Sequence, residues 1–402
     1  MKSFFYSMIT VAATATFAHG QSLYDLAMPI GLEESLPLKW NANVSFGYDD
    51  NVNATSSSRY GKQESAYGSL GIGASMSNYD SRTQYSFDMN LGLISYFSKL
   101  SDGTEQVMSN SKVNGRLTHH FDSTMSYSAS VSLAWQPEPD YGTGISASRR
   151  MGDYLYVYLN NSLSKAWDTR WSTTFGVSGS LLAYQENVGK SDNRDYLTLY
   201  VNNRYKWTER LAVSLNVSGT YCDRKYGLDD KSLFLMGGLE YALTANTSAT
   251  LLVGPQFKFI DGTTKCYPSV EGAINHRVSD RLSVRGFVRY ANEANNTYYG
   301  SGRNFLSNES WRVGASSTWQ FTPRFSASLE GNFISSHYNR STASNLSSYT
   351  QDTFNVNTGL YFKMTEALTA QVTYSFTRGQ YLAYGVETYN RNVFAVGAVY
   401  SF

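Results

Sequence analysis

Apolar and polar residues alternate along most of the chain. After Leu211, the side chains of Val213, Leu215 and Val217 alternate with smaller or polar ones, and the segment 394–402 repeats this pattern. A period of two is typical of a β-strand whose two faces meet different surroundings. The pattern therefore predicts an all-β chain built from strands with one apolar face.

Short turn signals separate pairs of these strands at regular intervals. Asp80, Asp122 and Asp168, for example, lie 42 and 46 residues apart. Longer polar stretches, such as 49–64, 136–152 and 291–305, lie between successive pairs. With a first strand at 39–49 and a last strand at 390–402, the chain has about 18 strands, joined alternately by short turns and long loops. The turn signals are 80–82, 122–124, 168–170, 208–210, 244–246, 279–281, 322–324 and 365–367.

A repeat of this length has two structural interpretations. A propeller blade needs four short strands per repeat, whereas each repeat here contains two long strands. A sheet can cross a membrane only when it closes on itself, because every backbone polar group in lipid must be paired. We therefore predict a transmembrane antiparallel up-and-down β-barrel of about 18 strands, with short periplasmic turns and longer extracellular loops.

The composition fits a wall in contact with lipid. Aromatic residues make up 15% of the chain and charged residues only 16%, and no apolar run reaches the roughly 18 residues of a membrane helix. Aromatic residues gather near the turns and near the opposite strand ends, as in the two girdles of a membrane barrel. The turn-side group is Phe121, Trp167, Trp171, Trp207, Phe321, Phe325, Phe362 and Phe402, and the opposite group is Tyr48, Tyr67, Tyr96, Trp135, Tyr221, Tyr267 and Trp311.

The N-terminus has the features of a secretory signal peptide. Lys2 precedes a mostly apolar stretch, and Ala18-His19-Gly20 forms a small-x-small cleavage site. We expect a signal peptide at 1–20, a short periplasmic segment at 21–37 and the barrel at 38–402. Removing residues 1–20 leaves 32 basic and 32 acidic residues, a neutrality that argues against a nucleic-acid partner. The predicted location is the bacterial outer membrane, with both termini periplasmic.

The two ends of the barrel carry a resemblance to known proteins. The first strand ends in the motif Gly47-Tyr48-Asp49-Asp50-Asn51-Val52, and the chain ends in Tyr400-Ser401-Phe402. The first strand resembles that of a family of outer-membrane β-barrel porins, some of which are associated with exopolysaccharide export. The C-terminal residues resemble the signal by which the barrel-assembly machinery recognises outer-membrane barrels, which assigns this role to Tyr400 and Phe402. The resemblance bears on the fold more than on the function.

Residues that alternate with the apolar ones should face the lumen, and many of them are serine or glycine. An 18-stranded barrel is wide enough for water unless loops fill it. Basic residues outnumber acidic ones on the predicted inward face, which indicates a mild preference for anions, unless these charges only pair across strands. The pore-lining candidates are Arg116, Arg204, Lys206, Lys258, Arg285, Arg289, Arg312, Asp88, Glu240 and Glu330, and Glu271 shares their face.

The third outer loop is a candidate constriction. General porins narrow their channel with a loop in this ordinal position, and theirs also carries a Pro-Glu…Gly-type stretch. Glu138 and Asp140, opposed by inward arginines, would create a transverse field there, whereas the alternative is an ordinary solvated loop. The constriction-loop candidates are Glu138, Asp140, Arg149 and Arg150.

Other chemistry has weaker support. Asp49, Asp50 and Asn51 offer clustered oxygen ligands for calcium, but their spacing is not that of a calcium-binding loop, and turn chemistry is the favoured reading. Cys222 and Cys266 lie at predicted outer strand ends in an oxidising compartment, where a disulfide is an open alternative. The histidines form no catalytic or metal-ligating pattern, so we predict no enzymatic activity, no metal and no cofactor.

These features predict a porin-like channel for passive diffusion of small hydrophilic solutes. The alternatives are a conduit for exopolysaccharide export and a structural or adhesive barrel with a blocked lumen. The expected partners are outer-membrane lipid, the barrel-assembly machinery, and small solutes or a polysaccharide. Porin-like barrels often form homotrimers, but no interface can be identified from the chain.

Overall fold

The computed structural model describes residues 38–56, 61–100, 106–137, 153–184, 193–224, 229–260, 262–293, 305–340, 348–382 and 386–402. The predicted signal peptide, the segment 21–37 and the constriction-loop candidates Glu138, Asp140, Arg149 and Arg150 lie outside these ranges. Within the described ranges, no helix is long and apolar enough to cross a membrane.

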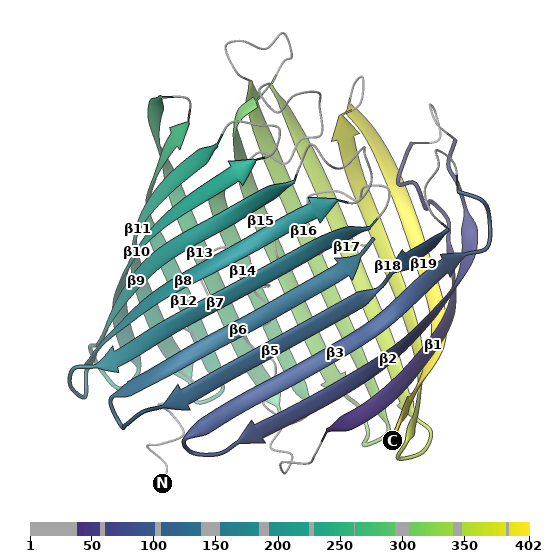
Figure 1. The fold of residues 1–402 in the computed structure, drawn as a ribbon, viewed down its shortest axis with the longest axis horizontal. Helices are drawn as coiled ribbons and strands as arrows, with labels where there is room; N and C mark the ends of the chain where they lie inside the picture. The colour runs from purple at the N-terminus through teal and green to yellow at the C-terminus, as the bar shows by residue number, and fades with distance from the viewer. Residues whose placement is uncertain are drawn as a thin grey trace.

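The strands form one antiparallel sheet that closes into a barrel (Figure 1). Each strand pairs with the next, and the last strand pairs with the first. Two short segments, β4 and β5, both pair with β3, so they occupy one of 18 strand positions. The strands are β1 Lys39–Asp49, β2 Ser65–Tyr79, β3 Thr83–Tyr96, β4 Val107–Ser109, β5 Ser111–His120, β6 Met125–Gln136, β7 Tyr154–Ala166, β8 Trp171–Tyr184, β9 Arg194–Lys206, β10 Leu211–Arg224, β11 Asp230–Thr244, β12 Thr247–Ile260, β13 Thr263–Ser279, β14 Leu282–Glu293, β15 Phe305–Gln320, β16 Phe325–Arg340, β17 Tyr349–Lys363, β18 Leu368–Leu382 and β19 Val386–Ser401.

The structure confirms the prediction of an antiparallel barrel of 18 strands and the position of all eight short turns. The first strand has the predicted bounds. The last strand begins at Val386 rather than at residue 390, because its pairing with β18 continues to Leu382. We call the end of the barrel with the eight short turns the turn end, and the opposite end the loop end.

The first residue of several turns explains why the chain reverses there. The carboxylate of Asp168 accepts hydrogen bonds from the main-chain nitrogens of Arg170 (2.6 Å) and Trp171 (2.7 Å). Thr208 holds the next turn in the same way through its hydroxyl, which accepts from the nitrogen of Leu211 (3.0 Å). These side chains replace main-chain partners that the tight turn cannot supply. The two hydrogen bonds also lower the pKa of Asp168 below its usual value.

The outward face of the barrel is apolar. Phe46, Leu70 and Leu199 have exposed fractions of 64%, 65% and 61%, and residues of the same alternating set carry large apolar side chains on every strand. At the turn end, Phe121, Trp167, Trp171, Trp207, Phe362 and Phe402 are exposed, as predicted for a girdle. The described surface therefore exposes the side chains that a soluble protein would bury.

Tyr67 and Tyr96 of the predicted loop-end girdle point the other way. Tyr48, Trp135, Tyr221 and Trp311 are exposed, whereas Tyr67 and Tyr96 are buried on the inward face with ring centroids 5.7 Å apart. The prediction was wrong for this pair because an odd number of residues along a strand places two side chains on opposite faces. Tyr67 lies three residues from the outward Leu70, and Tyr96 lies three residues from the outward Leu93. Both rings instead join an inward apolar cluster with Val52, Ile94, Leu100, Met108 and Ala395.

The barrel closes where β1 meets β19. At the turn end, Phe402 and Trp40 exchange two main-chain hydrogen bonds of 3.0 and 3.3 Å. The side chains of Tyr400 and Phe402 lie on the outward face with ring centroids 5.9 Å apart. Their recognition by assembly machinery stays a prediction.

At the loop end, the closure is held by side chains of the Gly47–Val52 motif. Asp49 accepts hydrogen bonds from Arg391 at 3.0 Å (Nε) and 2.5 Å (Nη2). Asp50 accepts from the main-chain nitrogen of Asn392 (2.7 Å) and from its side-chain amide (2.8 Å). The Asn51 amide donates to the carbonyl oxygen of residue 390 (2.8 Å). We call this set the seam clasp; it comprises Asp49, Asp50, Asn51, Asn390, Arg391 and Asn392.

The seam clasp explains why the motif contains these residues. Its two carboxylates, considered above as calcium ligands, are occupied by Arg391, Asn392 and Lys62. Burial raises the pKa of Asp50, but the hydrogen bonds from Asn392 and Lys62 outweigh this effect and lower it below the usual value. Gly47 leaves room for the inward ring of Tyr67, because an added Cβ would overlap that ring and lie 2.5 Å from the carbonyl oxygen of Phe394.

Candidate functional site

The inward face of the barrel is the candidate functional surface, because a solute inside a closed barrel meets only these side chains. Strand register places all ten predicted charges opposite to the exposed apolar set, seven of them basic and three acidic. Their positions are therefore inward, whereas their role in conduction stays a prediction. They are Asp88, Arg116, Arg204, Lys206, Glu240, Lys258, Arg285, Arg289, Arg312 and Glu330.

Several inward charges near the loop end form ion pairs that are buried from solvent. Lys258 Nζ lies 2.7 Å from a carboxylate oxygen of Asp230, and their side chains are only 2% and 4% exposed. The guanidinium of Arg224 lies 3.5 Å from the same oxygen. We call the whole group the buried charge cluster; it comprises Arg224, Asp230, Lys258, Glu271, Arg289, Glu293 and Arg312.

The other half of the cluster is centred on Glu293. Arg312 donates two hydrogen bonds to this carboxylate, each 2.7 Å long. Arg289 lies 3.7 Å from Glu293 and 3.2 Å from Glu271. Such two-pronged arginine–carboxylate pairs are among the stronger polar contacts in proteins. Burying a charge is costly unless it is paired in this way. These cations are therefore held in ion pairs with the carboxylates of the cluster.

The end of β14 is held by side chains of β12 rather than by the main chain of β13. Pairing between β13 and β14 stops at Val270 and Tyr290, although β14 stays paired with β15 up to Glu293. The side chain of Gln256 exchanges two hydrogen bonds with the main chain of Asn292, at 2.7 and 2.9 Å. Since Gln256 faces inward, the last residues of β14 lie on the inner side of β13. They narrow the lumen at this level.

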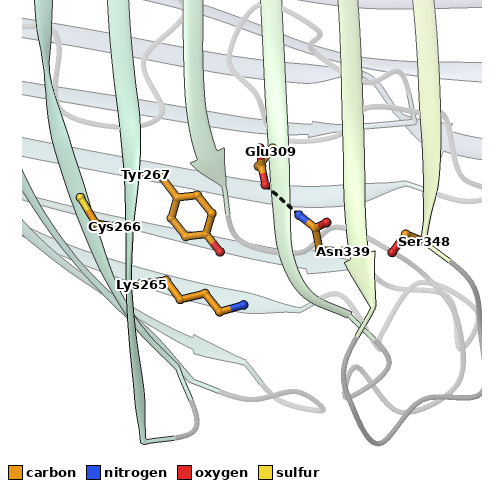
Figure 2. A pocket seen from close by; sticks show the side chains of 6 residues that line it. All are labelled: Lys265, Cys266, Tyr267, Glu309, Asn339 and Ser348. Carbon is orange, nitrogen blue, oxygen red and sulfur yellow. Dashed lines mark hydrogen bonds between the residues drawn. The ribbon is translucent and has the colours of Figure 1, made fainter.

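Beside the end of β14, a gap lies between side chains of β13, β15 and β16 (Figure 2). Lys265 and Tyr267 of β13 point into it, and the amide of Asn339 donates to Glu309 across from them (2.8 Å). The expected place of Tyr267 in the outward girdle is therefore wrong. The gap is lined by Lys265, Cys266, Tyr267, Glu309, Asn339 and Ser348.

The structure does not form the disulfide considered above. Both cysteines are free, Cys222 buried in β10 and Cys266 exposed in β13. Two strands separate them, and three strand spacings of about 4.8 Å exceed the roughly 7 Å that a disulfide can bridge. They also lie on opposite faces of the wall. Cys222 and Cys266 were both predicted at the outer ends of strands, but a shared level along the barrel axis does not bring two residues close together around its circumference.

Buried tyrosines cover the inward face of β7, β8 and β9. Tyr154, Tyr156 and Tyr158 are 2%, 6% and 3% exposed. Tyr154 packs against Tyr184 with ring centroids 5.7 Å apart, and Tyr200 donates a hydrogen bond to Asn160 (3.0 Å). The inner side of β7 to β9 is therefore covered by closely packed side chains.

The inward charges on other strands are less enclosed. Arg204 donates to Glu240 (2.8 Å) nearer the turn end, and Lys206 is exposed. Asp88 on β3 and Arg116 on β5 are also exposed, and neither takes part in an ion pair within the described residues. Among the predicted charges, the buried charge cluster thus holds Lys258, Arg289 and Arg312 in ion pairs. Asp88, Arg116 and Lys206 are exposed instead, and Arg285 and Glu330 are half-buried.

Sequence reasoning missed several inward charges. Arg224, Asp230 and Glu293 complete the buried charge cluster, and Lys112 is exposed on β5. Each would have been found by continuing the alternation to the strand end: Arg224 is two residues beyond Cys222, and Lys112 is four residues before Arg116. Arg391 was missed in the same way.

Three of the histidines that the structure describes have hydroxyl partners. Each of His119, His276 and His337 shares a hydrogen bond with a threonine on the neighbouring strand, at 2.8 to 3.0 Å. Among the described residues, no group of three or more histidine, cysteine or acidic side chains is placed to hold a metal ion.

Comparison with known proteins gives only distant similarities. No protein-family model matches the chain, and no curated protein matches it in sequence. Among solved structures, OccAB4 of Acinetobacter baumannii is 11% identical, with a TM-score of 0.43 over 92% of this chain and 99% of that one. OccK1 (OpdK) of Pseudomonas aeruginosa is 9% identical (TM-score 0.44, 92% and 100% covered), and a BenF-like porin from Pseudomonas fluorescens Pf-5 is 10% identical (0.44, 91% and 99%).

Proposed function

We propose that the protein is a porin-like channel of the bacterial outer membrane, through which small hydrophilic solutes diffuse passively with a mild preference for anions. One observation carries the proposal: the sheet is closed, its outward face is apolar and exposed, and its inward face is polar and charged. Closure pairs every strand edge, which a sheet needs in lipid. The exposed aromatic side chains at both ends match the girdles of a membrane barrel.

The proposal includes an orientation. Short turns of bacterial barrels face the periplasm and long loops face outward, so the turn end, with the start of β1 and the end of β19, would be periplasmic. The anion preference follows from the surplus of basic over acidic residues among the ten inward charges. Transport would depend on size exclusion and on the field of these side chains, with no chemical step.

A barrel with a filled lumen is the second candidate. The buried tyrosines of β7 to β9 and the buried charge cluster support it, because both reduce the free space inside. A polysaccharide conduit would need a continuous track of exposed polar side chains along the lumen. Because the charges of the buried charge cluster are not exposed, they support a conduit less than they support a filled lumen. The three functions therefore differ in how much of the lumen is open.

Conductance of the full-length protein in a planar bilayer tests the proposal. The folded barrel, isolated from outer membranes in detergent, should insert and produce stable steps, and the reversal potential across a KCl gradient should indicate anion preference. A barrel that inserts and stays silent would reject the channel in favour of a filled lumen. Protein found soluble in the periplasm would reject both.

A further inference from the structure

The inward charges differ sharply in whether a solute can reach them. In the buried charge cluster, Lys258 and Arg312 each have side chains only 2% exposed. On β5, by contrast, Lys112, Asn114 and Arg116 are all exposed on the inward face, and so is Asp88 on the neighbouring strand. An ion crossing the lumen would contact the second group directly and the first group hardly at all.

The two groups also differ in pairing. Every cation of the buried charge cluster lies within 3.7 Å of a carboxylate. Among the described residues, the side chains of Lys112, Arg116 and Asp88 take part in no hydrogen bond or ion pair. A tight ion pair acts on a distant ion as a dipole, whereas an unpaired charge acts as a full charge. The unpaired group should therefore dominate the interaction with a passing ion.

Strand geometry arranges the exposed group as a ladder. Side chains two residues apart on one strand face lie about 7 Å apart, so Lys112, Asn114 and Arg116 cover about 14 Å along β5. Asp88 lies opposite Asn114 and thus between the two cations. We call these four residues the β5 ladder. It carries two positive charges and one negative charge.

The neighbours of the ladder leave space in front of it. On β6, the residues opposite Arg116, Asn114 and Lys112 are Ser130, Ser132 and Ala134. On β2, the inward residues facing Asp88 and its neighbour are Ser75 and Gly73. These small side chains contrast with the tyrosines that fill the inner side of β7 to β9. The small side chains beside the β5 ladder therefore leave its charges exposed to the lumen.

We infer that the β5 ladder, and not the larger buried charge cluster, determines which ions the lumen favours, with small anions contacting Lys112 and Arg116 in turn. The inference rests on the proposed channel function and assigns its selectivity to particular residues. It narrows the expectation that the surplus of basic residues over the whole inward face sets the preference. The ligand class is a small anion, for which chloride serves as the probe.

Three substitutions, each changing one unit of charge, test the assignment by reversal potential in a KCl gradient. Arg116→Gln should lower the chloride-to-potassium permeability ratio by roughly threefold to sevenfold. One unit charge acting through water at about 7 Å changes the local chloride and potassium concentrations about threefold each, in opposite directions, and salt screening lowers this effect. Asp88→Asn should raise the ratio by a similar factor. Arg289→Gln removes the same charge from a buried pair and should change the ratio much less, because the buried Glu271 left without this partner takes up a proton. Lys231→Gln, on the exposed outward face of β11, is the control for charge outside the lumen.

The fold of each variant is checked by the mobility of unheated samples on gels, so that a misfolded barrel is not mistaken for a selectivity change. An Arg289→Gln effect as large as that of Arg116→Gln would overturn the assignment. So would unchanged ratios in Arg116→Gln and Asp88→Asn while conductance is retained, and this outcome would leave the proposed channel intact. A silent wild-type barrel would instead reject the channel and the ladder together.

Discussion

The Asp49–Arg391 pair of the seam clasp should be one of the larger single contributions to the stability of the barrel. The Asp49 side chain is fully buried and Arg391 is 5% exposed. The carboxylate accepts from the guanidinium and also from the main-chain nitrogen of Asn51 (3.0 Å). Replacing Asp49 by Asn removes the negative charge that faces the buried guanidinium of Arg391. Breaking a buried pair in this way costs about 3–5 kcal/mol.

The assay is equilibrium unfolding of the barrel in lipid vesicles by urea, followed by tryptophan fluorescence and by gel mobility. With a loss of about 4 kcal/mol, the unfolding midpoint of Asp49→Asn should fall by on the order of 1 M urea or more. Lys62→Gln removes the half-exposed partner of Asp50 and is the matched control. An exposed ion pair contributes only about 0–1 kcal/mol.

A double-mutant cycle separates the pair from its surroundings. Asp49→Leu and Arg391→Met should each cost about as much as Asp49→Asn, whereas the double variant that combines them should recover much of the loss, because no unpaired charge remains buried. Additive losses, or single variants within about 0.5 kcal/mol of the wild type, would refute the reasoning, since independent sites add within about that margin.

Three further predictions concern local contacts. Gly47→Ala should lower the free energy of unfolding by about 1–3 kcal/mol through overpacking against Tyr67, whereas Gly219→Ala, which has open space around it, should not; equal effects would contradict the contact. In the folded barrel, a maleimide should label Cys266 quickly and Cys222 slowly, and a disulfide-dependent shift on non-reducing gels would contradict the free thiols. The pKa of Asp168 is lowered on folding, so its contribution is present above the unfolded pKa of about 3.9 and is lost as pH falls through the folded value. The urea midpoints of wild type and Asp168→Ala should therefore differ at pH 7 and converge in acid; a constant difference would show that the turn hydrogen bonds do not depend on the charge.

The fold could be predicted because its determinants are local. Alternation specifies strand faces, and residues such as Asp168 and Thr208 specify turns within three positions of themselves. Closure then follows from the need to pair every edge. The alternation also predicts the inward orientation of Tyr67 and Tyr96. Their nearness to a strand end favours a girdle position, but it does not determine which face of the sheet a side chain lies on.

The properties of the site are not local, and this limits the prediction. All ten proposed lumen charges lie inward, yet nothing within β12 indicates that Lys258 pairs with Asp230 on β11. The burial of an inward charge depends on the path of the neighbouring strands. The end of β14, for example, lies on the inner side of β13. The separation of Cys222 and Cys266 depends on the number of strands between them. Alternation can therefore identify which charges face inward, but not which of them remain accessible.

The seam clasp also has a consequence for how the chain folds. Asp49 and Arg391 are 342 positions apart in sequence, so nearly the whole chain lies between two residues that must meet. Contacts of such high contact order form slowly, because the entropy of closing the loop is lost before the contact stabilises anything. Until β19 is made and paired, β1 and the growing opposite edge are both open to pairing with other chains. We therefore expect the clasp to form last, as the step that converts an aggregation-prone open sheet into a barrel without edges.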